Sequence, residues 1–171
     1  PDWRAIVFLG VVGYYLASLF DFLGLQYITA ALERLVLFLY PTFVVLISAF
    51  LYGRAIAGRD IAALALSYTG IALVFANDLA TRQENVLLGA FWVALSALAY
   101  AVYLIGNGRM VKKMGSVLFA SLASIVSCVA VVAHFLVVRD AHLLWSQPAP
   151  VYGLTFLMAI VSTVLPVPFM S

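Results

Sequence analysis

The sequence predicts an all-α membrane protein, a polytopic bundle of transmembrane helices, and three observations support this fold class. Hydrophobic residues make up 66% of the 171 residues and charged residues only 9%, whereas a soluble domain carries about 25% charged residues. The apolar residues form six long stretches joined by short polar loops. These stretches are continuously apolar instead of alternating, which favours helices over barrel strands, and a helix satisfies its own backbone hydrogen bonds in lipid.

The length of each apolar stretch sets the expected elements, because a helix needs about 20 residues to cross the hydrocarbon core of a bilayer. The third stretch is short, and the sixth continues to the end of the chain. Since the chain begins at Pro1 and stops inside an apolar stretch, we expect it to be a fragment that does not transport alone. The six predicted helices cover 5–27, 29–52, 60–76, 86–106, 114–138 and 151 onward.

The basic residues predict how the helices are oriented. Cytoplasmic loops of membrane proteins carry an excess of Lys and Arg, and one side of this chain holds six basic residues against three on the other. The richer side has Arg4, Arg54, Arg59, Arg109, Lys112 and Lys113, and the poorer side has Arg34, Arg82 and Arg139. We therefore expect the loops between the second and third helices and between the fourth and fifth helices to be cytoplasmic, with the chain in the cell (inner) membrane.

Composition and motifs exclude several classes of function. The net charge of +2 is small and dispersed, so we expect no nucleic-acid partner. The single cysteine, Cys128, can form neither an internal disulfide nor a cysteine-cluster metal site. The sequence has no metalloprotease, nucleophile-elbow or phosphate-loop motif, so we expect no enzyme activity, cofactor or metal. The expected partners are a small-molecule substrate, the lipid bilayer and, left open, a second copy in a homodimer.

Several segments resemble the EamA-type proteins of the drug/metabolite transporter superfamily. They are GLQYITAA over 24–31, the apolar runs around Pro41 and before Gly53, YTGIALV over 68–74 and LAYAVY over 98–103. The family often has Glu after the glycine that closes the second of these helices, whereas this chain has Arg54, so no role of that Glu carries over.

The resemblance implies ten helices in two inverted five-helix repeats. On this basis, 1–77 would be the end of the first repeat and 86–171 the start of the second, each contributing three helices, the last one truncated. It further implies a secondary transporter that exports a small organic metabolite, such as an amino acid-like compound, a nucleoside or a drug, by alternating access. A non-transporting membrane scaffold and, less favoured, an intramembrane enzyme remain the alternatives.

Three ionisable residues lie inside predicted membrane helices, where charges are costly and call for an explanation. Asp21 precedes the first turn, and Glu33 and Arg34 follow it, so all three fall at a similar depth. One interpretation is an Asp21–Arg34 ion pair that locks the hairpin. The other is a gate or a coupling site formed by these residues near the outer mouth.

Polar residues at helical spacing predict a substrate cavity. Ser96, Tyr100 and Tyr103 share one face of the fourth helix, and such a stripe either faces a cavity or packs against a neighbour. The full set of cavity candidates is Tyr14, Tyr40, Ser96, Tyr100, Tyr103, Ser162 and Thr163. Pro41 and Pro166 are predicted helix kinks, which flank binding sites in many transporters but also serve as static bends.

Overall fold

The computed structural model describes residues 2–53, 58–80 and 85–161, and the described residues form helices without any strand. The first membrane span consists of α1 (Trp3–Gly10), a π-helical turn η1 (Val11–Leu16) and α2 (Ala17–Gly24). The second consists of α3 (Ala30–Leu37) and α4 (Tyr40–Tyr52). The remaining elements are α5 (Gly58–Ala80), α6 (Val86–Met114), α7 (Ser116–Val138), the short 3₁₀ helix η2 (Ala141–Leu144) and α8 (Ala149–Ala159).

A helix lies at each of the six predicted positions, which confirms the predicted fold class. Within the described ranges, four helices are long and apolar enough to cross a membrane, and α8 is shorter. The main difference is at α6, which continues through 107–114 instead of ending at Gly106. Nothing in this polar segment breaks a helix until Gly115, which adopts φ +86°, and Lys112 and Lys113 in the last turn favour the helix C-terminus electrostatically.

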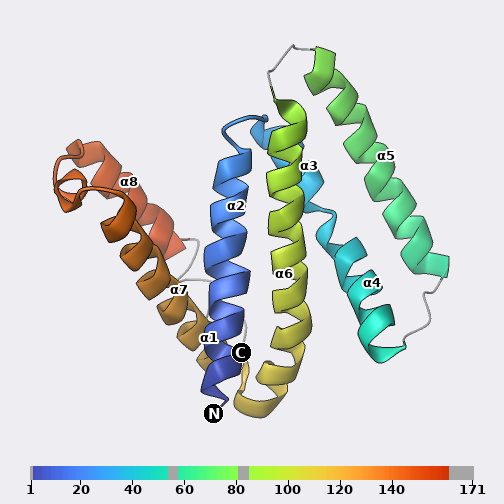
Figure 1. The fold of residues 1–171 in the computed structure, drawn as a ribbon, viewed down its shortest axis with the longest axis horizontal. Coiled ribbons are helices and arrows are strands. Elements are labelled where there is room, and N and C mark those ends of the chain that lie inside the picture. The colour runs from blue at the N-terminus through green and yellow to red at the C-terminus, as the bar shows by residue number, and fades with distance from the viewer. Residues whose placement is uncertain (1, 54–57, 81–84, 162–171) are drawn as a thin grey trace.

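The first span and α6 form the centre of the bundle (Figure 1). Glycines allow α2 and α6 to touch at backbone level: a Cβ atom added to Gly24 would lie 2.9 Å from the carbonyl oxygen of Gly89. Small residues at such contacts replace the hydrophobic effect, which does not drive helix association in lipid, with close van der Waals packing. The α2–α6 contact therefore fixes the two helices that position the cavity described below.

A second packed region joins α1, α6 and α7 around the fully buried Phe119. Its ring stacks on Tyr103 with 6.1 Å between ring centroids, and Ile6 and Leu9 of α1 complete the cluster. Many large apolar side chains on α5, α7 and α8 are exposed, as Leu66 (77% exposed) and Val137 (85% exposed) illustrate. Such an apolar outer surface is the one expected of a protein solvated by lipid.

Two polar contacts gather at the end of α6 that carries its basic residues. Lys113 Nζ lies 2.9 Å from Asp2 Oδ2, and this contact lowers the pKa of the Asp2 carboxyl below its usual range. The Arg109 guanidinium lies over the ring of Tyr52 at the end of α4, 4.8 Å from its centroid. These contacts tie the ends of the first and second spans to the same end of α6.

Candidate functional site

A cavity of about 230 Å³ lies where the first span, α3 and α6 meet. Its lining combines a carboxylate, two tyrosine rings and two serines with small apolar residues. Tyr14 and Tyr100 sit at or next to the middle residues of their spans, so the cavity lies near the centre of the bundle's thickness. The lining residues are Gly13, Tyr14, Ala17, Ser18, Asp21, Leu37, Ser96 and Tyr100.

Irregular backbone borders this cavity on two sides. The π-helical turn Val11–Leu16 interrupts the first span and carries Tyr14, and such turns are frequent at functional sites. In the second span, α3 ends at Leu37 and α4 begins at Tyr40. Pro41 lies in the first turn of α4, where it has no N–H to donate to the Leu37 carbonyl. The cavity is thus bounded by a discontinuous helix at membrane depth.

Tyrosine side chains from three spans form a continuous cluster at this level. The Tyr40 and Tyr100 rings meet edge to face at 5.3 Å, and Tyr100 stacks on Tyr103 at 6.0 Å. The hydroxyl groups of Tyr103 and Tyr14 are hydrogen-bonded at 3.1 Å. Tyr103 itself is buried and packs close to Gly13, where any added Cβ would collide with its ring. It therefore supports the two lining rings from behind instead of lining the cavity.

A buried hydrogen bond joins the two main walls of the cavity. Ser96 Oγ donates to the carbonyl oxygen of Ala17 at 2.7 Å, and Ser96 is 2% exposed. Because the bond runs from a side chain of α6 to the backbone of α2, it sets both the separation and the rotation of the two helices beside the cavity.

We expect Ser96→Ala to destabilise the protein by roughly 0.6–1.7 kcal/mol, the range of interhelical hydrogen bonds measured in membranes. The Ala17 carbonyl would lose a donor in a site that water does not reach easily. An SDS titration of the protein in mixed micelles measures the effect. The control is Ser121→Ala on the exposed face of α7, and equal stability of the two variants would contradict the assigned role of the Ser96 bond.

The carboxyl groups of Asp21 and Glu33 lie within hydrogen-bonding range of each other. Glu33 is 1% exposed, and its Oε2 atom lies 3.2 Å from Arg34 Nε. Two carboxyl oxygens of the pair, Asp21 Oδ1 and Glu33 Oε1, are buried without a hydrogen-bond partner. Within the described ranges, Arg34 forms its ion pair with its neighbour Glu33, and the alternative Asp21–Arg34 ion pair is not formed.

The structure brings most of the sequence-predicted site residues together. Tyr14, Ser96, Tyr100 and Asp21 line the cavity, while Tyr40 and Tyr103 contact its lining rings. Ser162, Thr163 and Pro166 lie outside the described residues. The sequence reasoning missed Gly13, Ser18 and Leu37. Ser18 falls three residues before Asp21 on the same helix face, a spacing that could have identified it.

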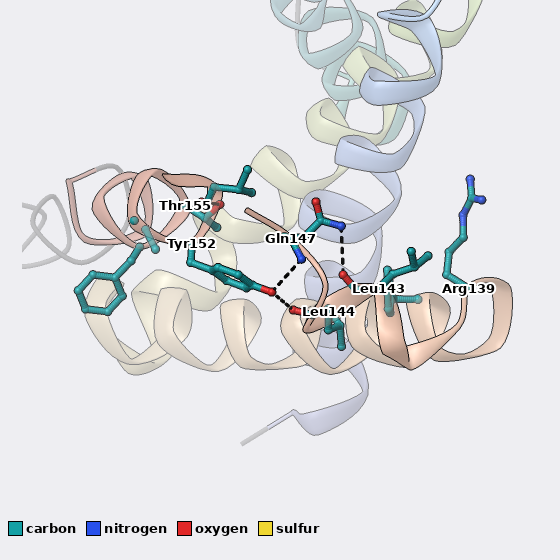
Figure 2. A pocket seen from close by; sticks show the side chains of 11 residues that line it. Arg139, Leu143, Leu144, Gln147, Tyr152 and Thr155 are labelled. Carbon is teal, nitrogen blue, oxygen red and sulfur yellow. Dashed lines mark hydrogen bonds between the residues drawn. The ribbon is translucent and has the colours of Figure 1, made fainter. Parts of the chain in front are cut away.

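A larger cavity of about 970 Å³ lies between the end of α7, η2 and α8 (Figure 2). Its lining includes Arg139, and the side chains of Gln147, Tyr152 and Thr155 form hydrogen bonds within the segment. The Tyr152 hydroxyl donates to the Leu144 carbonyl at 2.7 Å and accepts from the Gln147 N–H at 3.1 Å, and the Gln147 side chain donates to the Leu143 carbonyl. This apolar groove joins consecutive elements at one end of the bundle, so we assign the central cavity as the functional site despite its smaller volume.

The described part of the chain holds no group of three or more His, Cys, Asp or Glu residues that could bind a metal ion. The central cavity offers one carboxylate, hydroxyl groups and aromatic rings. This lining suits binding of a small solute.

Comparison with known proteins identifies the first part of the chain. Residues 1–76 match the EamA-like transporter family, which confirms the predicted resemblance. A Bacillus subtilis (strain 168) protein named as the uncharacterized transporter YcbK is 28% identical over 167 residues, which cover 96% of this chain and 53% of that protein. The chain thus spans about half the length of this curated relative. No solved structure matches.

Proposed function

We propose that this multi-pass membrane chain, whose residues 1–76 match the EamA-like transporter family, forms part of a secondary transporter for a small organic metabolite. The observation that carries the proposal is the central cavity. It is lined from three membrane segments, it contains polar groups at a depth where lipid-facing positions are apolar, and intramembrane ionisable residues in such places mark substrate and ion pathways.

Alternating access would use the discontinuity of the second span. Transporter sites commonly lie at broken helices near the bilayer midplane, around which one group of helices rocks against another. Here the break between Leu37 and Tyr40 adjoins the cavity, so α3 and α4 can tilt by different amounts. The structure keeps the neighbouring α2–α6 contact at backbone level, which suits it to remain fixed during such a motion.

The Asp21–Glu33 pair is the proposed coupling or gating element, with Arg34 as its basic partner. Two carboxyl groups in contact favour sharing one proton, because both cannot ionise at low cost in a buried site. Asp21 also lines the cavity, so a change in its charge reaches the bound solute directly. This arrangement supports proton-coupled movement. Export, and a cytoplasmic location of the α4–α5 connection and of the α6–α7 junction at Gly115, are further parts of the proposal.

The test is to profile metabolites in the medium and in the cytoplasm of cells that overexpress the gene encoding this chain. We expect one class of compound to accumulate outside and Tyr100→Ala to reduce this accumulation roughly tenfold, since losing a contact of about 1.4 kcal/mol changes an equilibrium tenfold. The matched control is Tyr68→Ala on the exposed face of α5, which should transport normally. No change in any compound, in either direction of transport, would favour the membrane scaffold instead.

A further inference from the structure

The central cavity is lined by one carboxylate, that of Asp21, and by no basic residue. Arg34, the basic residue nearest in sequence to the acidic pair, is bound to Glu33 and is itself 73% exposed. Asp21 interacts with the carboxyl group of Glu33, and its Oδ1 atom is buried without a hydrogen-bond partner. None of the residues that line the cavity is Lys, Arg or His. A carboxylate in this position attracts a cationic ligand.

The aromatic part of the lining favours the same type of ligand. The faces of aromatic rings attract cations, most strongly where water is excluded. Tyr14 and Tyr100 line the cavity, and each is held by a second ring: Tyr103 lies edge to face with Tyr14 at 5.1 Å, and Tyr40 does so with Tyr100. The Tyr14 and Tyr103 hydroxyls bind each other. Rings fixed in this way need little reordering when a ligand binds.

The volume of the cavity limits the size of the ligand. At about 230 Å³, it is smaller than the ~300 Å³ that marks the lower end of pockets for drug-sized molecules. A compact alkylammonium group fits this volume together with the single carboxylate and the two rings. A drug-sized molecule exceeds it.

We propose that the central cavity binds a small organic cation of the alkylammonium class, with the Asp21 carboxylate as counter-ion and the Tyr14 and Tyr100 rings as walls. This inference rests on the proposed function, because it names the substrate class of the same cavity. It goes further than that function by excluding neutral and anionic metabolites as preferred substrates.

The test compares choline with 3,3-dimethylbutan-1-ol, its neutral isostere, by calorimetric binding to the protein in lipid nanodiscs. We expect choline to bind at least roughly tenfold more tightly, since the two probes share a shape and differ in charge. Asp21→Asn should remove this preference, whereas Asp140→Asn in the exposed segment after α7 should retain it. Tyr100→Phe should retain choline binding, and Tyr100→Leu, which removes the ring, should weaken it severalfold.

Equal binding of choline and its isostere, or an unchanged preference in Asp21→Asn, would overturn the inference. If Asp21→Asn does not fold, as judged by its elution and helicity, the Tyr100→Phe and Tyr100→Leu pair decides, and identical loss in both would count against a cation–ring contact. The outcome for transport is separate. If choline binds with the expected preference but is not transported, the cation site is supported and the transporter proposal is contradicted. If neutral metabolites are transported and choline does not bind, the transporter proposal is supported and the cation site is contradicted.

Discussion

Phe119→Ala should destabilise the protein by roughly 2–4 kcal/mol. The side chain is fully buried among α1, α6 and α7 and stacks on Tyr103. Removing the ring of a buried Phe costs about 3–5 kcal/mol in soluble proteins, part of which is the cavity left behind. In lipid the hydrophobic transfer part is smaller, but the lost packing remains, because packing is what holds membrane helices together. An SDS titration of folded protein measures the difference.

The control is Phe50→Ala, since Phe50 on α4 is 89% exposed and faces outward. We expect its stability to be within about 0.5 kcal/mol of the unmodified protein, as is usual for surface substitutions. A similar loss in both variants would show that the Phe119 cluster is not packed as described. Because Tyr103 supports the lining rings of the central cavity, we also expect Phe119→Ala to weaken solute binding.

Gly89→Ala should separate α2 from α6 and destabilise the protein by roughly 1–3 kcal/mol, the usual cost of overpacking. The added Cβ would lie 2.6 Å from Ile28 Cγ2, 2.9 Å from Tyr27 Cβ and 3.0 Å from the Gly24 carbonyl oxygen. The last of these is backbone and cannot move aside as a flexible side chain does. The same titration, together with the thermal denaturation midpoint in detergent, measures the loss.

Gly108→Ala provides the matched control on the same helix, because nothing lies within 4 Å of its added Cβ. Alanine is a better helix residue than glycine by about 0.5–1 kcal/mol, so this variant should be unchanged or slightly more stable. Opposite signs for the two substitutions are the expected result. A stabilising effect at Gly89 would be incompatible with backbone contact between α2 and α6.

The fold was predictable because the apolar stretches are long and sharply bounded. Among the described residues, length and hydropathy locate the long helices, but they miss the break between α3 and α4 and misplace the end of α6. Polarity begins at Asn107 and predicts the end of the helix there, whereas the helix continues to Met114 and stops at Gly115, where the backbone takes a positive φ. Polarity marks where a helix leaves the hydrocarbon, which is a different point from where its hydrogen bonding stops.

The candidate site was predictable in part. Helical spacing placed Ser96 and Tyr100 on one face, and equal distance from a turn placed Asp21 and Glu33 at one depth, so local geometry sufficed for these residues. It could not show that Tyr103 turns into the packed core, because that depends on Gly13 from the first span. The π-helical turn at Val11–Leu16 was not predicted from the sequence either.

The glycine contact between α2 and α6 has a mechanical consequence. Two helices that touch through their backbones resist sliding and rolling over each other, because such motion brings carbonyl groups toward neighbouring atoms. The line of contact at Gly24 and Gly89 is therefore suited to be a fixed axis about which the other helices rotate. Any rearrangement that opens the cavity to one side of the membrane must turn the outer helices about this line, and the carboxylate-bearing turn of α2 stays at rest while they move.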